Sequence, residues 1–105
     1  MNQVVQIATH WAVDEFFAGR SVCVIVPAQT YWMQEFNPLR QLILDGADGI
    51  YIRASSFRSS LLSIRVDTLI IVEPDLCVRE ALLDARRMTH LSRSPKILRI
   101  SDDYI

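Results

Sequence analysis

The fold of this chain is decided by the stretch Leu69-Ile70-Ile71-Val72-Glu73-Pro74-Asp75, which is apolar until it meets an acidic residue. Side chains alternate between the two faces of a strand, so a run that is apolar at every position predicts burial on both faces. Strands of this kind belong to parallel sheets that helices cover. A second such run, Ser21-Val22-Cys23-Val24-Ile25-Val26-Pro27, lies earlier in the chain and ends in proline.

Helical patterns surround these two runs. Apolar residues recur at helical spacing from Val4 to Ala18, and Gly19 follows as a natural C-terminal stop. Residues 31–36, 38–45 and 78–88 predict further helices, and residues 49–55 and 96–100 predict further strands. The resulting order predicts one α/β domain over residues 1–105. We expect a small three-layer sandwich, in which a mostly parallel sheet of about four strands carries helices on both faces.

Local residues predict where the helices begin. A proline inside a helix costs about 3 kcal/mol, so Asn37 and Pro38 predict an N-cap and the first helical position after it. Asp75 predicts the cap of the last helix. On that helix, Val78 opens the apolar stripe, and Asp84 is expected to face away from the core.

Composition restricts the class of protein. Half of the 105 residues are apolar, which is enough to build a core. No apolar run approaches the ~20 residues of a membrane span, and the N-terminal pattern is not that of a signal peptide, so no membrane partner is expected. Cys23 and Cys77 lie far apart, which predicts two reduced thiols in a cytoplasmic protein. Their spacing relative to the two histidines predicts no zinc site, and no cofactor is expected.

Charge is distributed unevenly, although the formal net charge is −1. Acidic residues outnumber basic ones over residues 1–50, and the reverse holds over residues 51–99. The two halves could pair within the fold or between subunits. Alternatively, the basic half could bind nucleic acid or phosphate, because guanidinium groups form forked bonds with phosphate oxygens. The candidate residues for that role, or for binding a partner, are Arg53, Arg58, Arg65, Arg86 and Arg87.

Two segments resemble parts of the core of P-loop NTPases of the helicase and terminase type. One is the helix to Ala18 with the following run from Gly19 to Pro27. The other is the run from Asp67 to Glu73, whose end is similar to a Walker B Asp-Glu pair. The resemblance covers about residues 3–76 and implies an NTPase-like framework. It matches Glu73 to the catalytic acid and puts Val72 where the family has a magnesium-binding Asp.

The phosphate-binding part of that family is not found in the sequence. The chain has three glycines, one lysine (Lys96) and no G-x-x-x-x-G-K-[ST] motif, and Met1 falls where the Walker A loop would just have ended. Without backbone amides that cradle phosphate, we expect no binding or hydrolysis of ATP. No complete catalytic constellation is evident either, so no catalytic residue is assigned.

Glu73 and Asp75 form a candidate vestigial acidic site at a strand-to-helix junction. Two carboxylates at this spacing could bind a divalent cation or take part in acid–base chemistry. The structural alternative makes Asp75 an N-cap and Glu73 the partner of a nearby arginine. On this alternative no metal is assigned.

Aromatic residues supply a candidate interface. The first helix is more apolar than one face can bury in so small a monomer, and the sheet edge also needs a cover. A homodimer through this helix or a sheet edge is therefore expected. The interface candidates on the helix are Trp11, Phe16 and Phe17. Trp32 joins them if it is exposed, although core packing is its default role.

Together these observations predict a non-catalytic protein-interaction domain on an NTPase-like framework, such as a small phage or mobile-element protein would use. Its partner would be another protein or a second copy. The alternative is a nucleic-acid or phosphate-binding protein that uses the basic second half. The first function requires an exposed apolar patch, whereas the second requires the five arginines on one face.

Overall fold

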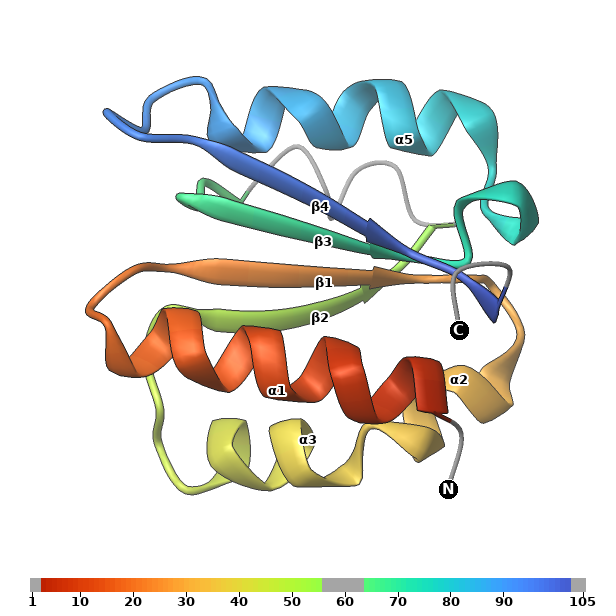
Figure 1. Ribbon diagram of the computed structural model, residues 1–105, viewed down its shortest axis with the longest axis horizontal. Coiled ribbons are helices and arrows are strands. Elements are labelled where there is room, and N and C mark those ends of the chain that lie inside the picture. The colour runs from red at the N-terminus through yellow and green to blue at the C-terminus, as the bar shows by residue number, and fades with distance from the viewer. Residues whose placement is uncertain (1–2, 56–63, 103–105) are drawn as a thin grey trace.

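The strands form one parallel sheet, in agreement with the predicted α/β fold (Figure 1). The computed structural model describes residues 3–55 and 64–102. β1 spans Val22–Val26, β2 spans Ile50–Ala54, β3 spans Thr68–Val72 and β4 spans Lys96–Ile100. Their order across the sheet is β2-β1-β3-β4, and each neighbouring pair is parallel. β1 and β3 are therefore central, and β2 and β4 lie at the edges.

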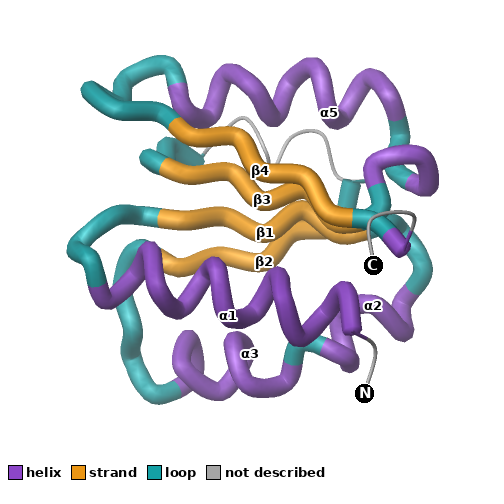
Figure 2. Tube along the Cα trace, viewed as in Figure 1, coloured by secondary structure: helices purple, strands orange, loops and turns teal. Residues whose placement is uncertain are grey.

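Helices cover both faces of the sheet, which gives the predicted three layers (Figure 2). α1 (Gln3–Phe17), α2 (Thr30–Glu35) and α3 (Asn37–Leu44) lie on one face. α5 (Arg79–Ala85) and the 3-10 helix η2 (Arg86–Thr89) lie on the other. The apolar core is divided in the same way, since one cluster joins α1, α2 and α3 to the sheet and a second joins α5 and η2 to it.

The two central strands account for this layering. Every residue of β1 and of β3 is buried. In β1, Val22 and Val24 pack in the cluster on the α1 side, whereas Cys23 and Ile25 pack in the cluster on the α5 side. The sequence-based prediction of strands buried on both faces is confirmed.

β4 departs from this pattern. Ile100 is buried, but Lys96, Ile97 and Arg99 are exposed and Leu98 is half-buried. No strand in the described part of the chain pairs with the outer edge of β4. β4 is therefore the last strand on one side of the parallel sheet. It contains three apolar residues, and its outer edge is open to solvent.

The break between α2 and α3 lies where Pro38 predicts it, but the predicted N-cap at Asn37 is wrong. Asn37 is the first residue of α3, and Phe36 is the capping residue. Phe36 also ends α2, so a single residue separates the two helices and leaves no place for a separate polar cap. Pro38 is tolerated because it lies in the first turn, where its missing N–H has no helical acceptor.

The predicted cap at Asp75 is also wrong. β3 ends in a sharp turn at Glu73, whose φ of 49° and ψ of 64° place it in the left-handed region. The chain then forms a 3-10 turn, η1 (Pro74–Leu76), which contains Asp75. Because of this turn α5 begins only at Arg79, and Val78 is its N-cap.

This late start also changes which residues of α5 face the core. Val78 precedes the helix and is exposed, so it does not open the buried stripe as predicted. Asp84 is 5% exposed, which contradicts its predicted outward position. The reason is its spacing, since Asp84 follows the buried Ala81 by three residues and precedes the buried Met88 by four.

The environment of Cys23 gives a test of this core. Its side chain is fully buried, and burial raises the pKa of the thiol to about 12 against the opposing charge of Arg53. The thiolate is the reactive form, so Cys23 should not react with iodoacetamide at pH 8 in the native protein. Labelling should follow global unfolding and become complete in denaturant. Mass spectrometry of the Cys77→Ser variant measures the labelling of Cys23. Rapid labelling of Cys23 in the native protein would contradict the packing of β1.

Candidate functional site

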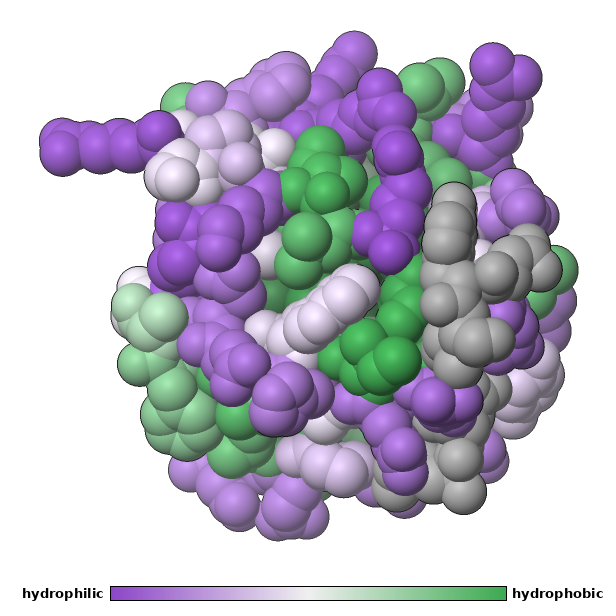
Figure 3. Space-filling model, in the orientation of Figure 1, coloured by the Kyte–Doolittle hydropathy of each residue, from purple (hydrophilic) through white to green (hydrophobic). Residues whose placement is uncertain are grey.

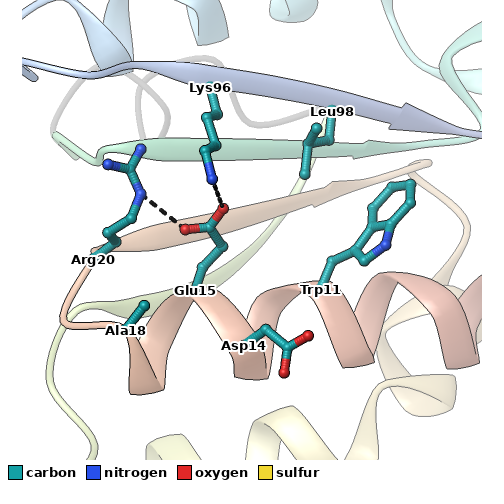
Figure 4. Close-up of a pocket in the computed structure, with 7 residues that line it drawn as sticks. All are labelled: Trp11, Asp14, Glu15, Ala18, Arg20, Lys96 and Leu98. Atoms are coloured by element: carbon teal, nitrogen blue, oxygen red, sulfur yellow. Dashed lines mark hydrogen bonds and ion pairs between the residues drawn. The ribbon is translucent and has the colours of Figure 1, made fainter.

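A groove lies between α1 and the exposed face of β4, and it has a volume of about 340 Å³. We call it the α1–β4 groove. Figure 3 shows the molecule in the orientation of Figure 1, with apolar side chains gathered in the middle of the visible face and polar ones around them. The groove is lined by Trp11, Asp14, Glu15, Ala18, Arg20, Lys96 and Leu98, which are drawn in Figure 4.

Helical and strand periodicity bring these side chains together. Trp11 and Glu15 are four residues apart on α1, so they share one side of the helix, and Ala18 follows three residues later in the turn after its last residue. Lys96 and Leu98 are two residues apart on β4, so both point to the α1 face of the sheet. The groove thus combines one stripe of a helix with one face of an edge strand.

The groove has an apolar end and a charged end (Figure 4). Trp11 and Leu98 lie at the apolar end, and both are half-buried and packed against the main core cluster. Glu15, Arg20 and Lys96 lie at the charged end. Apolar surface next to fixed charges is an arrangement that suits recognition of a partner.

The charged end is an ion-pair network around Glu15. The Arg20 Nε lies 2.8 Å from Glu15 Oε2, and the Lys96 Nζ lies 3.0 Å from Glu15 Oε1. The Glu15 side chain is 10% exposed, whereas that of Lys96 is 50% exposed. Because each carboxylate oxygen already has a cationic partner, Glu15 joins α1 to β4 and is poorly placed to act as a base.

Arg20 extends this network to the start of β3. Its guanidinium donates to the hydroxyl of the buried Thr68 at 3.2 Å, and also to the carbonyl oxygens of Asp67 and Ser94. These bonds connect the end of α1 with the first residue of β3 and with the loop that leads into β4. Arg20 therefore helps to hold the edge strand in register with the sheet.

Asp67 completes the connection at this end of the sheet. Ser92 Oγ donates to its Oδ1 at 2.7 Å, and the Ser21 N–H and hydroxyl donate to its Oδ2 at 3.1 and 3.2 Å. These contacts lower the pKa of the Asp67 carboxyl. The hydrogen bond from Ser92 has the largest effect, and the positive charge of the nearby Arg20 has a smaller one. The loops before β1, β3 and β4 are thereby tied together.

The predicted interface residues occupy different environments. Trp11 lines the α1–β4 groove, and Phe17 is 73% exposed at the end of α1. Phe16 is half-buried against the core and forms an edge-to-face contact with Phe17, with ring centroids 5.4 Å apart. Trp32 is 3% exposed and belongs to the core cluster, so its role as an interface residue is corrected to core packing.

The described residues of the predicted basic set lie at both ends of the sheet. Arg65 precedes Val66, whose N–H donates to the carbonyl of Met88 at 2.8 Å, so Arg65 lies near the exposed Arg86 and Arg87 of η2. Arg53 pairs in register with Ile25 near the opposite, carboxyl end of the strands. Arg58 and the serine-rich residues 56–63 lie outside the described residues.

The acidic pair is placed by the turn after β3. One oxygen of the Glu73 carboxylate accepts the N–H of Asp102 at 3.0 Å, and the Glu73 N–H donates to the carbonyl of Ile100. Glu73 thus fastens the end of β4 to the end of β3, which replaces the predicted pairing with an arginine. Asp75 is exposed in η1. Within residues 3–55 and 64–102, no group of three or more His, Cys, Asp or Glu side chains could hold a metal ion.

Sequence reasoning missed Glu15, Arg20, Lys96 and Leu98 as members of a common site. The four-residue spacing of Trp11 and Glu15 was an available signal for one side of the groove. The contact between Glu15 and Lys96 spans 81 residues, and it depends on β4 lying beside β3. Periodicity in a single sequence does not give the order of strands.

Comparison of the chain with protein-family models, with curated proteins and with solved structures gave no match. Among the helices that the structure describes, none has the length and apolar character needed to cross a membrane.

The network around Glu15 should contribute measurably to stability. Glu15→Gln keeps the shape of the side chain but removes the charge that both Arg20 and Lys96 contact. We expect a loss of about 1–3 kcal/mol in the free energy of unfolding, because charged hydrogen bonds in a largely buried site are lost. Urea denaturation measures this loss.

Asp14→Asn is the matched control for this change. Asp14 Oδ2 lies 3.3 Å from His10 Nε2, and both side chains are more than half exposed. An exposed pair of this kind contributes about 0–1 kcal/mol. Equal losses in the two variants would show that the network around Glu15 does not hold β4.

Proposed function

We propose that this chain is a non-catalytic protein-interaction domain on an NTPase-like α/β framework, and that it binds its partner through the α1–β4 groove and the adjoining edge of β4. The observation that carries the proposal is the exposure of an apolar strand at the edge of an all-parallel sheet. Ile97 is 39% exposed on the α5 side, and Leu98 is half-buried on the α1 side.

Parallel sheets are normally covered on both faces, because each strand is flanked by crossover helices. β1 and β3 obey this rule completely. β4 has the same kind of apolar residues, yet no described helix closes its α1 side beyond Trp11. A bound protein would supply the missing cover, and Leu98 would be at the centre of the contact.

The surroundings of the groove also suit an interface. Protein interfaces commonly combine an apolar centre, enriched in aromatic residues, with a polar rim. Here Trp11 and Leu98 provide the centre, while Lys96 and Arg20 are held in place by Glu15. Because these charged side chains are already ordered, less side-chain entropy is lost when a partner binds.

A capture experiment tests the proposal against nucleic-acid binding. Tagged protein is used to isolate partners from a lysate of the source organism, before and after nuclease treatment. We expect nuclease-resistant capture that Leu98→Lys abolishes, because a charge is placed in the apolar centre. Leu91→Lys is the matched control, since Leu91 is 80% exposed and lies outside the groove.

The competing proposal is that the basic half binds nucleic acid or phosphate. It predicts the opposite result in the capture experiment. Capture would be lost with nuclease or in the double variant Arg86→Gln/Arg87→Gln, and Leu98→Lys would have no effect. The described arginines support this alternative less well, because Arg53 lies at the far end of the strands from Arg86 and Arg87.

Nucleotide and metal binding give a separate prediction, which follows from the resemblance to P-loop NTPases. We expect no heat of binding for Mg-ATP in calorimetry, and no rise in melting temperature with millimolar magnesium or manganese. Glu73→Gln should cost roughly 1–2 kcal/mol at most, since the amide oxygen can still accept the N–H of Asp102. A metal-dependent rise that disappears in Glu73→Gln would overturn the non-catalytic assignment.

A further inference from the structure

We propose that the partner of the β4 edge is a second copy of this chain, which pairs antiparallel to β4 about a two-fold axis at Leu98. This inference rests on the proposed function, because it names the partner of the same surface. It predicts a continuous sheet across the dimer, with Leu98 of one copy directly opposite Leu98 of the other.

The backbone of β4 determines which groups face outward. In a parallel sheet, alternate residues of a strand direct both N–H and C=O to the same neighbour. The Lys96 N–H donates to the carbonyl of Asp67, and the carbonyl of Ile100 accepts the N–H of Glu73, so Lys96, Leu98 and Ile100 bond to the β3 side. Ile97 and Arg99 therefore present their N–H and C=O groups at the open edge.

The antiparallel two-fold registers that keep most of β4 paired are those centred on its three middle residues, Ile97, Leu98 and Arg99. Centring on Ile97 would place Arg99 opposite Pro95, which has no N–H to donate. Centring on Arg99 would place two arginines directly opposite each other, and such like-charge pairs are destabilising. Centring on Leu98 places Ile97 of each copy opposite Arg99 of the other, so the two arginines are not opposed. Pro95 then lies outside the paired residues of β4, opposite Ser101.

The Leu98-centred register also satisfies the outward groups. Ile97 and Arg99 of opposite copies form hydrogen-bonded pairs, each of which exchanges two N–H···O=C bonds. Leu98 then forms a non-hydrogen-bonded pair with its own copy, where opposing side chains approach most closely. On the α1 face, the two leucines join the two α1–β4 grooves, so each copy covers the apolar end of the other.

The other sheet edge does not offer the same surface. In β2, Ile50 and Ile52 are buried, and the remaining residues are half-buried. In β4, by contrast, apolar residues on both faces are accessible, which makes β4 the edge that gains most from a cover. A two-fold contact covers both copies of that edge at once and leaves neither open.

Cysteine cross-linking tests the register. Ile97→Cys, Leu98→Cys and Arg99→Cys are made separately in the Cys77→Ser background, and the buried Cys23 is retained. Only the residue on the two-fold axis faces itself within the Cα separation of about 4.4–6.8 Å that a disulfide requires. We expect mild oxidation to give a disulfide-linked dimer with Leu98→Cys, at least about tenfold faster than with either neighbour. Faster cross-linking of Ile97→Cys or Arg99→Cys would overturn the register.

A proline substitution tests the backbone bonds while the fold is kept. Ile97→Pro removes an outward N–H, which edge strands tolerate, and Ile97→Ala is the matched control that keeps this N–H. Sedimentation should show a dimer for the wild type and for Ile97→Ala. The dimer dissociation constant of Ile97→Pro should be higher than that of Ile97→Ala by roughly tenfold or more, because each copy loses one donor. Circular dichroism melting confirms that both variants are folded, and equal dissociation constants would contradict the pairing.

The failure of this inference can be separated from the failure of the proposed function. A wild-type monomer at tens of micromolar overturns the inference. If that monomer still captures a protein in a manner that Leu98→Lys abolishes, the proposed function stands and the edge serves a different partner. If it captures nothing, both fail. A dimer that cross-links at residue 98 supports the inference whether or not another protein is captured.

Discussion

The structure depends on the burial of β1 and β3 on both faces. Every side chain of these two strands is apolar or, at Thr68, a buried hydroxyl that is hydrogen-bonded to Arg20. Such strands are stable only between two apolar layers, so α1 and α3 are required on one side and α5 on the other. The two separate core clusters follow from this requirement, since the sheet itself divides them.

β4 shows what happens where this requirement is met only in part. Its inner edge pairs with β3 over five residues, while its outer edge and much of its surface remain accessible. The ion pair with Glu15 and the bond between Glu73 and Asp102 hold the two ends of this region, one from α1 and one from β3. These contacts within the chain therefore fix the position of the edge. A preorganised edge loses less conformational entropy on binding than a mobile one would.

The sequence was sufficient for the strands and for most helices because their signals are local. A run such as Val22 to Val26 is apolar at every position, and a proline such as Pro38 is accepted only in the first turn of a helix, so it predicts a break just before it. The prediction of a cap at Asp75 is wrong because the left-handed turn at Glu73 delays the helix, and no residue type there predicts that conformation. The sequence is compatible with either a core or an interface role for Trp32. The burial of its side chain in the structure assigns it to the core. The α1–β4 groove was not predictable, since Glu15 and Lys96 meet only through the strand order.

An exposed strand at the edge of a sheet can pair with further copies of the chain without limit. The residues around β4 limit such pairing. Pairing of β4 with the β2 edge of another copy would be heterologous, and repetition of it would extend a sheet without end. Pro95, Lys96 and Arg99 are residues of the kinds that natural edges use against such pairing. Two of them, Pro95 and Arg99, disfavour the registers centred on Ile97 and Arg99. In the register centred on Leu98, no donor is missing and no charges are opposed within the residues of β4. The features that oppose open-ended association are therefore consistent with the closed, two-fold contact proposed for this edge.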